Sequence, residues 1–345
     1  MPYDYSKEQN IKNRQRVNEI SQSLPSFIGQ YLMAKAASTL SSSQLSYMYD
    51  IREFLEWWRD NVPEFRDREL KLLTVDDVAK VTPLDVNEYL YSLSSTQNPK
   101  TLGRKCTALS SLFSYLVRMD MIESNPMDKV DRPKIRKDNI IIKLENDEIK
   151  QLIDAIEKGC PGMSKQQQKY LENTKERDLA IIMLLLGTGI RVSECVGLDI
   201  DDISFKEHKM QITRKGAKRQ SLALSDEVMG VLQAYLEKRL KDEPEALKDK
   251  RALFLSTRKT RMCPAAVENM VTKYADALGF GRHITPHKLR KTYGTNLYNA
   301  TRDIYLVANA LGHESVNTTT QHYVGKNDED LQEVRNLLSL KNNDV

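Results

Sequence analysis

Large apolar residues recur in steps of three and four through the first part of the chain, which is the spacing of amphipathic helices. The first apolar stripe consists of Tyr47, Ile51, Phe54, Leu55 and Trp58. The second stripe, which follows the helix-breaking pair Asn98–Pro99, consists of Leu102, Cys106, Leu109, Phe113 and Leu116. We therefore predict an all-helical domain over residues 1–130.

Basic residues gather in two places near the end of this predicted domain. Lys100, Arg104 and Lys105 lie largely off the second stripe, so we expect them on the open face of that helix, either solvated or facing a phosphate backbone. Residues 131–143 show no helical period, and we interpret them as an extended basic linker between two domains. The candidate phosphate contacts in this linker are Arg132, Lys134 and Arg136.

From residue 144 onward, helical patterns alternate with a short region of strand-like pattern. The apolar run Leu179–Leu186 predicts a buried helix, and the Gln- and Lys-rich stretch Lys158–Lys175 is interpreted as a surface loop. Residues 208–225 alternate apolar and polar positions around a Lys-Gly turn, which predicts a β-hairpin. Helical periodicity predicts further helices over 226–240, 264–278, 286–299, 303–311 and, as an amphipathic tail, 327–345.

Length and composition fit two globular domains. A chain of 345 residues exceeds what one hydrophobic core usually organises, and 40% of its residues are hydrophobic and 29% charged. No apolar run approaches the roughly 18 residues of a membrane span, and the first thirty residues lack the order of a secretory signal. Four widely spaced cysteines without a CxxC pair indicate a reducing compartment. We expect a cytoplasmic protein without a membrane span.

Net charge alone does not identify a partner. The 52 Lys and Arg residues exceed the 48 Asp and Glu residues by four. The sequence pI of about 8.6 is below the value of about 9 that marks an evident nucleic-acid-binding domain. The functional argument therefore rests on local motifs.

Two motifs in the first half of the second domain carry basic groups suited to phosphate chemistry. Arg191 comes just after the Gly187-Thr188-Gly189 turn, and Glu194 follows three residues later. A carboxylate at that spacing shares a helix face with the arginine and orients its guanidinium. Lys215 lies directly before the glycine of the predicted hairpin turn.

Three more candidate residues follow towards the end of the chain. Thr285 and Pro286 predict a helix start, with Thr as the cap and Pro at the first position. His287 and Arg290 then project from one face of that helix. The segment Leu311-Gly312-His313 ends the next helix at a glycine, and Tyr323 comes ten residues after the histidine.

Together these residue types suit the transfer of a phosphodiester bond to a tyrosine. Two arginines on one phosphate stabilise the charge that builds on its non-bridging oxygens, and a tyrosine oxygen, with a pKa of about 10, is then a competent nucleophile. The departing sugar oxygen needs a general acid, which a hairpin lysine can supply. No metal or cofactor is required. His283 and His287 have the i, i+4 spacing of zinc ligands, but Pro286 interrupts the helix between them and no third ligand follows.

The motifs and their order resemble the tyrosine recombinase family. Its signature is an arginine in TG-x-R-x-S-E, a lysine in a hairpin turn, an H-x-x-R pair, an LGH histidine and a C-terminal tyrosine. The resemblance spans the chain and is nearest to Xer-type recombinases, particularly the single-recombinase form of streptococci, through segments Lys175–Ile182 and Thr213–Gly216. It implies a mainly α fold with a small β-sheet: a helical, SAM-like core-binding domain and a mixed α/β catalytic domain at 144–345. The implied catalytic set is Arg191, Lys215, His287, Arg290, His313 and Tyr323, with Glu194 in support.

Three positions depart from the family pattern or make it ambiguous. Lys291 stands where the family often has histidine, and the spacing of His313 and Tyr323 is ten residues where many Xer proteins have nine. Lys218 lies three residues after Lys215, although the family pattern favours the lysine directly before the glycine. The runner-up function is an integrase or excisionase of a mobile element. A type IB topoisomerase and a non-catalytic DNA-binding protein are more distant alternatives.

The resemblance also implies a mechanism and partners. Tyr323 would form a 3′-phosphotyrosyl bond and strands would exchange through a Holliday junction, without ATP, metal or cofactor. The implied partner is duplex DNA with an inverted-repeat site, bound by a dimer and synapsed as a tetramer through the tail helix 327–345. The implied role is resolution of chromosome dimers, in the cytoplasm at a bacterial nucleoid. The sequence identifies neither the target site nor an accessory protein.

Overall fold

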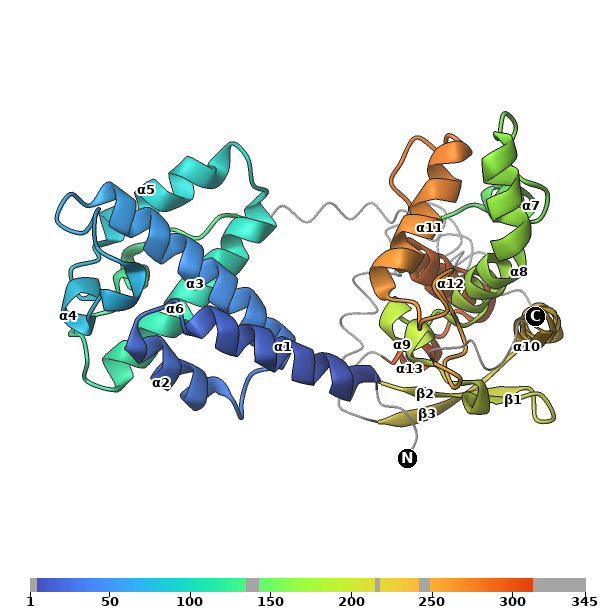
Figure 1. Cartoon of the computed structure of the whole chain (residues 1–345), viewed down its shortest axis with the longest axis horizontal. Helices are drawn as coiled ribbons and strands as arrows, with labels where there is room; N and C mark the ends of the chain where they lie inside the picture. The colour runs from blue at the N-terminus through green and yellow to red at the C-terminus, as the bar shows by residue number, and fades with distance from the viewer. Residues whose placement is uncertain (1–4, 135–142, 215–217, 242–248, 313–345) are drawn as a thin grey trace, which may run out of the picture. The chain divides into compact units, whose positions relative to one another are not determined.

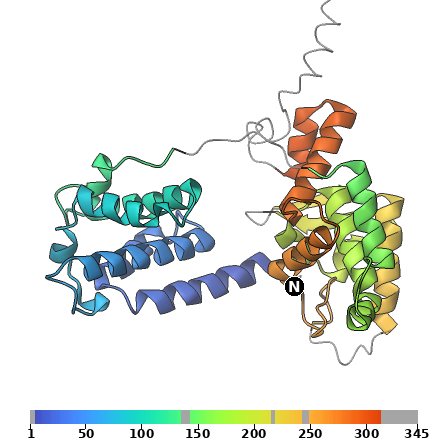
Figure 2. The same ribbon diagram turned by 90° about the horizontal axis from the view of Figure 1, so that it is seen from above.

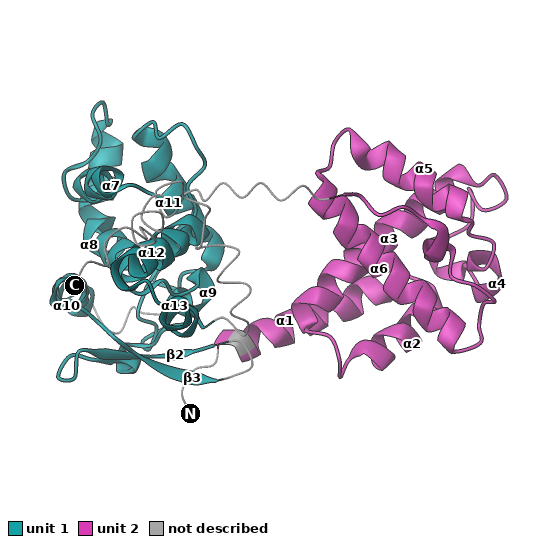
Figure 3. Cartoon of the chain, turned by 180° about the vertical axis from the view of Figure 1, so that it is seen from behind, with its two compact units in different colours: residues 1–4, 138–345 teal, residues 5–137 magenta. Residues whose placement is uncertain are grey.

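The computed structural model describes residues 5–134, 143–214, 218–241 and 249–312. The chain divides into two compact units (Figure 3): residues 5–137, here the helical unit, and residues 138–345 with the first four residues, here the mixed unit. Several predicted features lie outside the described residues, namely Arg136, Lys215, His313, Tyr323 and the tail 327–345.

The described part of the helical unit is built from helices joined by short turns (Figure 1). Its elements are α1 (Tyr5–Ser21), α2 (Ser26–Lys35), α3 (Ser41–Asn61), α4 (Val75–Val78), α5 (Pro83–Ser94), α6 (Pro99–Arg118) and the 3-10 turns Leu70–Leu72 and Pro126–Lys129. The starts follow local sequence rules. The Asn98 side chain accepts a hydrogen bond from the Thr101 amide at 2.9 Å, and Pro99 occupies the first turn of α6. The helix-breaking pair is therefore the start of a helix.

The core of the helical unit forms where α3 meets α1, α5 and α6. Both predicted apolar stripes lie in this core, with Tyr47 alone only partly buried. Phe54 of α3 makes edge-to-face ring contacts with Tyr89 and Phe113, at centroid distances of 5.2 and 6.4 Å. Such pairs add to the stability that area burial provides. The helical prediction for this part of the chain is confirmed.

The expected exposure of Lys105 is wrong, because its side chain is only 3% exposed. Its ammonium lies 2.7 Å from a carboxylate oxygen of Glu53 and 3.3 Å from one of Asp50. Asp50 also accepts a hydrogen bond from Arg104, whose side chain remains 43% exposed. Helical steps of three and four place position 105 next to Leu102 and Leu109 of the apolar stripe, so a charge there reaches the core and has to be paired.

The mixed unit combines seven described helices with a small sheet. The helices are α7 (Asn146–Lys158), α8 (Lys165–Thr188), α9 (Val192–Gly197), α10 (Asp226–Lys241), α11 (Pro264–Ala277), α12 (Pro286–Thr301) and α13 (Ile304–Leu311). A 3-10 turn, Ile200–Asp202, precedes the sheet. The helices predicted at 226–240, 264–278, 286–299 and 303–311 are present as α10 to α13, with ends that differ by at most two residues.

Helix α8 is at the centre of the mixed unit and packs against α7, α9, α10 and α12. It runs side by side with α10 (Figure 2). The buried helix predicted from the run Leu179–Leu186 is the second half of α8 and is apolar on nearly all sides, which suits a helix covered by others. Its fully buried residues are Ala180, Ile181, Ile182, Leu184 and Leu185.

The surface loop predicted for Lys158–Lys175 is wrong over most of its length, because α8 begins at Lys165. The Ser164 side chain accepts a hydrogen bond from the Gln167 amide, and the Gln167 side chain accepts one from the Ser164 amide. Leu171 and Thr174 are the buried positions of this polar segment. Its other side chains extend the exposed face of the helix, so polarity indicated a loop where a well-capped helix forms.

The sheet contains three antiparallel strands in the order β1 (Ile203–Ser204), β2 (Lys209–Thr213) and β3 (Arg219–Ala223). Strands β2 and β3 form the predicted hairpin, in a register that pairs Met210 with Leu222 and Thr213 with Arg219. The two-residue strand β1 was not predicted, because a strand of that length carries no periodic signal. The predicted acid Lys215 comes between β2 and β3 in the sequence and lies outside the described residues.

Candidate active site

The site begins at the tight turn that ends α8. Gly189 closes this helix in the left-handed conformation, with φ of +61°. A Cβ added at this position would lie 2.3 Å from the ring of Tyr293, which belongs to α12. Both facts require glycine. The close approach of α8 and α12 places Arg191 at the start of α9, beside the helix that carries His287 and Arg290.

Arg191 is held by the carboxylate of Glu194. One Glu194 oxygen accepts a hydrogen bond from the Arg191 amide at 2.7 Å, and the other accepts one from Arg191 Nη1 at 2.9 Å. The structure therefore has the contact expected from the three-residue spacing. The Arg191 side chain remains 38% exposed while that of Glu194 is 5% exposed. The Arg191 guanidinium is thus held by a buried carboxylate, and its exposed part can contact an anion from solvent.

The same carboxylate holds a second arginine, which sequence reasoning missed. Arg214 is the residue directly after β2, and its Nη1 lies 3.0 Å from Glu194 Oε2. Its Nε donates to the side chain of Gln220, and its Nη2 donates to the carbonyl of Ala310 at 2.7 Å. Burial lowers the pKa of Arg214, against the opposing effect of Glu194. The signal in the sequence was only an arginine next to the predicted acid Lys215.

Arg290 projects from the first turns of α12 into the protein and is 3% exposed. Its Nη1 donates to the carbonyl of Gly189 and its Nη2 to that of Leu311, both at 2.5 Å. These carbonyls belong to the ends of α8 and α13, so the arginine joins three helices. Because helix C-termini carry unpaired carbonyls and partial negative charge, a buried cation suits this place.

His287 lies one turn before Arg290 and is exposed. Thr285 is at the cap position, as predicted, but its side chain makes no capping hydrogen bond. Pro286 occupies the first turn of α12. Burial lowers the pKa of Lys288, and the positive charge of Lys291 lowers it further. This region of α12 therefore presents a histidine and neighbouring cations.

Helix α13 ends next to the arginines. Gly312 ends this helix in the left-handed conformation, with φ of +61°, and a Cβ there would lie 2.8 Å from Nε of Arg214. The next residue is the predicted catalytic His313. The described part of the site thus brings together Arg191, Glu194 and Arg290 with the chain segments that lead directly to Lys215 and His313.

The candidate phosphate contacts of the helical unit differ in exposure. Lys100, Arg132 and Lys134 are exposed, Arg104 is exposed but ion-paired, and Lys105 is buried. We therefore remove Lys105 from this set. Among the described residues, no group of three or more His, Cys, Asp or Glu side chains could hold a metal ion. None of the described helices is long and apolar enough to cross a membrane.

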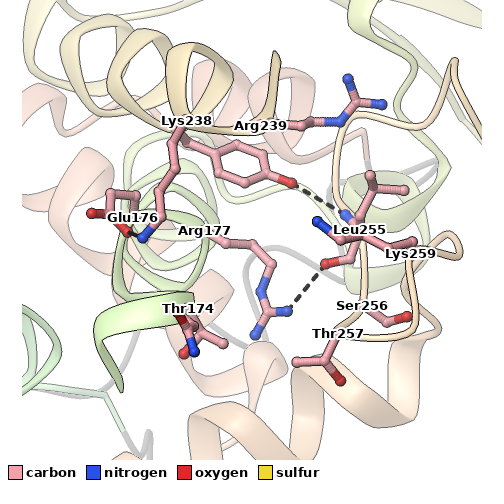
Figure 4. Close-up of a pocket in the computed structure, with 11 residues that line it drawn as sticks. Thr174, Glu176, Arg177, Lys238, Arg239, Leu255, Ser256, Thr257 and Lys259 are labelled. Atoms are coloured by element: carbon pink, nitrogen blue, oxygen red, sulfur yellow. Dashed lines mark hydrogen bonds and ion pairs between the residues drawn. The ribbon is translucent and has the colours of Figure 1, made fainter. Parts of the chain in front are cut away.

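A cavity of about 340 Å³ lies between α8, α10 and the segment 255–259 (Figure 4). Two of its cations have partners: Arg177 Nη1 donates to the carbonyl of Leu255 at 3.1 Å, and the ammonium of Lys238 lies 2.6 Å from a carboxylate oxygen of Glu176. Arg177 also pairs with Asp178. These contacts join the middle of α8 to its neighbours, and none of the lining residues belongs to the predicted catalytic set.

Comparison with protein families and curated sequences gives a consistent result. Residues 143–330 match the model of the phage integrase family. The tyrosine recombinase XerS of Streptococcus uberis is 32% identical over 350 residues, covering 91% of this chain and 96% of that protein. The tyrosine recombinase XerS of Streptococcus agalactiae is 33% identical over 345 residues, with the same coverage.

Solved structures show the same fold. A post-cleavage complex of the XerH site-specific recombinase with a palindromic difH substrate matches with a TM-score of 0.66 and 21% identity, covering 88% of this chain and 82% of that one. A lambda integrase dimer bound to a COC′ core site matches with a TM-score of 0.61 and 17% identity, covering 90% and 81%. At these identities the likeness supports the architecture and not individual residues.

Proposed function

The chain belongs to the phage integrase family of tyrosine recombinases, and on this premise we propose that it cuts and rejoins DNA at specific sites through a transient bond to Tyr323. The observation that carries the proposal is the convergence of Arg191 and Arg290 at the end of α8. These are the two arginines of the family signature, and they come from segments 99 residues apart in the chain. Their surroundings fit a phosphate clamp.

In this mechanism the two arginines neutralise the scissile phosphate. Arg191 is oriented by Glu194 and reaches the surface, which suits direct contact with a non-bridging oxygen. Arg290 adds positive charge from a buried position, where reduced solvent screening strengthens its electrostatic effect. His313 hydrogen-bonds to the same phosphate, and His287 takes the tyrosine proton.

The bond changes balance without an external energy source. The Tyr323 oxygen attacks phosphorus, the bond from phosphorus to the 5′-oxygen breaks, and Lys215 gives its proton to that oxygen. The product is a 3′-phosphotyrosyl bond and a free 5′-hydroxyl. Attack by the 5′-hydroxyl of a partner strand reverses these steps and releases the tyrosine. The phosphotyrosyl bond conserves the energy of the phosphodiester, and exchange of one strand pair at a time yields a Holliday junction.

Division of labour between the units follows the same proposal. The helical unit grips duplex DNA through exposed cations such as Lys100, and the mixed unit carries out the chemistry. Residues 131–143 act as the basic linker, with Arg132, Lys134 and Arg136 along the phosphate backbone. Phosphate contacts of this kind make binding sensitive to salt. Two protomers occupy an inverted-repeat site, and two such dimers synapse through the tail helix 327–345.

Resolution of chromosome dimers, in the cytoplasm at a bacterial nucleoid, is the biological role we propose. It is supported by the identity of about 32% with the streptococcal XerS proteins over nearly their whole length. Integration or excision of a mobile element is the second candidate, favoured by the ten-residue spacing of His313 and Tyr323. An inverted repeat in the DNA beside the gene would favour resolution, and neighbouring transposition genes would favour integration.

The proposal is tested by Tyr323→Phe, which keeps the ring and removes the nucleophilic oxygen. We expect site binding to persist while the covalent protein–DNA adduct, trapped on a nicked suicide substrate, disappears. The matched control is Tyr305→Phe, at a tyrosine that is 71% exposed on α13, and it should form adduct at the wild-type yield. Adduct formation by Tyr323→Phe at the wild-type yield would show that another residue is the nucleophile.

A further inference from the structure

Arg214 contacts the supports of both clamp arginines. Its Nη1 bonds to Glu194 Oε2 at 3.0 Å, and the other oxygen of that carboxylate holds Arg191. Its Nη2 bonds to the carbonyl of Ala310 at 2.7 Å, and the carbonyl of the next residue, Leu311, accepts from Arg290. One buried guanidinium thus lies between the two halves of the proposed clamp.

The placement is specific rather than incidental. The Arg214 side chain is 7% exposed, and each of its three nitrogens has an acceptor. A buried cation next to Arg191 is unfavourable by charge repulsion and desolvation. Gly312 leaves space for the Arg214 side chain, because a Cβ at position 312 would lie only 2.8 Å from Nε of Arg214. Only a planar group with donors on several edges can bond to all three acceptors at once.

We propose that Arg214 is a positioning residue that keeps Arg191 and Arg290 in register on the scissile phosphate. It acts through Glu194 on one side and through the end of α13 on the other, without touching the DNA. The inference rests on the proposed function, because the register matters only if the two arginines share a phosphate. Errors of about 1 Å in such a site cost on the order of 10²-fold in rate.

The test compares single-turnover cleavage by Arg214→Gln on three substrates, with the full-length protein at saturating concentration. On ordinary DNA we expect a loss on the order of 10²-fold. A scissile methylphosphonate carries no charge on its non-bridging atoms and needs less of a clamp, so the loss there should be several-fold smaller. A bridging 5′-sulfur removes the need for a general acid and not for a clamp, so the loss there should stay as large as on ordinary DNA.

Each alternative gives a different pattern. Recovery on the 5′-sulfur substrate would mean that Arg214 acts through its neighbour Lys215, and the proposal would be wrong. Equal losses on all three substrates would indicate a smaller folded fraction, which also contradicts it. The matched control is Arg219→Gln, which removes a charge from an exposed position on the same hairpin and should cleave within about twofold of wild type.

Two further variants cover the case in which Arg214→Gln does not fold. Arg214→Lys keeps a charge for Glu194 but cannot also reach Ala310, so we expect a rate between those of wild type and Arg214→Gln. In the double variant Glu194→Gln/Arg214→Gln no unpaired buried carboxylate remains. Because the contact with Ala310 is lost only in the double variant, its rate should lie below that of Glu194→Gln, by less than the 10²-fold expected for Arg214→Gln alone. A further independent 10²-fold loss would refute action through Glu194. If Tyr323→Phe removes the adduct while these variants behave as wild type, the recombinase function stands and this inference falls.

Discussion

The two units of this protein each contain a buried carboxylate that holds two cations, and the two arrangements serve different ends. In the helical unit, Asp50 is 2% exposed and binds Arg104, 43% exposed, and Lys105, 3% exposed. In the mixed unit, Glu194 is 5% exposed and binds Arg191, 38% exposed, and Arg214, 7% exposed. In each, one cation is covered and the other reaches solvent.

The difference lies in what the cations connect. Asp50, Arg104 and Lys105 belong to two long helices, α3 and α6, whose core packing already fixes their positions. Glu194 and Arg214 instead join the ends of three secondary-structure elements: the start of α9, the end of β2 and, through Ala310, the end of α13. Ends are where a backbone is least constrained by its own hydrogen bonds. The same ion-pair chemistry therefore joins packed helices in one unit and, on the proposed function, positions a reactive group in the other.

The largest effect that this comparison predicts is on chemistry in the mixed unit. Lys215→Ala should cleave ordinary DNA more slowly by on the order of 10²–10⁴-fold, the usual loss for a missing proton donor. Binding should change little, because one lysine is a minor part of many phosphate contacts. With sulfur at the bridging 5′-position the leaving group needs no acid, since a thiol has a pKa of about 8.5. Cleavage should then recover towards the wild-type rate.

Two controls define that result. Arg290→Ala should remain slow on the sulfur substrate, because its clamp is still missing. Lys218→Ala, three residues along the same turn, should be near normal on ordinary DNA. If Lys218→Ala is the slow variant that sulfur rescues, the acid lies at that position. If sulfur rescues neither lysine variant, some other group gives the proton.

The next effect separates the two carboxylates directly. Asp50→Asn removes one of the two carboxylates that pair with the buried Lys105 and leaves Glu53, at 2.7 Å, in place. It should therefore change the free energy of unfolding of the helical unit by no more than about 1–3 kcal/mol. Protein that remains folded should cleave at the wild-type rate once bound. Glu194→Gln should slow cleavage by the protein that remains folded and bound. Calorimetric unfolding and single-turnover rates at saturating protein measure the two quantities. A slow Asp50→Asn variant, or a normal Glu194→Gln variant, would remove the distinction drawn between the two networks.

Features that repeat along the chain were predictable from the sequence. The two apolar stripes gave α3 and α6, the alternating segment around Lys215 gave the hairpin, and Thr285–Pro286 gave the start of α12 to the residue. These signals are local, because periodicity and turn residues act within a few positions of one another. Each signature motif is likewise a short local segment, and the order of these segments along the chain indicated the family.

Features that depend on contacts between distant segments were not predictable. Lys105 looked like a surface lysine because its partners, Asp50 and Glu53, lie about fifty positions away. Arg214 was not recognised as a site residue, because its partners Glu194 and Ala310 come from other elements. Side-chain polarity alone cannot distinguish a solvated charge from one that is buried and paired.

The smallest expected effect is on the acid response of the mixed unit. Glu148 lies in the first turn of α7, where it accepts a hydrogen bond from the Glu145 amide at 2.8 Å, and it pairs with Arg282 at 2.5 Å. The Arg282 hydrogen bond lowers the pKa of Glu148, and burial opposes it. In the helical unit the direction is opposite, because burial raises the pKa of Asp50 against the attraction of Arg104 and Lys105.

A lowered pKa means that the folded state favours ionised Glu148. Its contribution to stability is therefore complete above the unfolded pKa of about 4.3 and is lost as pH falls through the lower folded pKa. Because this pair is partly exposed, the contribution should be below about 1 kcal/mol. The stability difference between wild type and Glu148→Gln, from calorimetric unfolding of the mixed unit, should shrink as pH falls below about 4.3. For Asp50 the contribution of the ionised carboxylate to stability should change in the opposite direction as pH falls. The reason is that protonation of Asp50 favours the folded helical unit. Differences that move in the same direction for both variants would show that the two carboxylates do not titrate as their surroundings indicate.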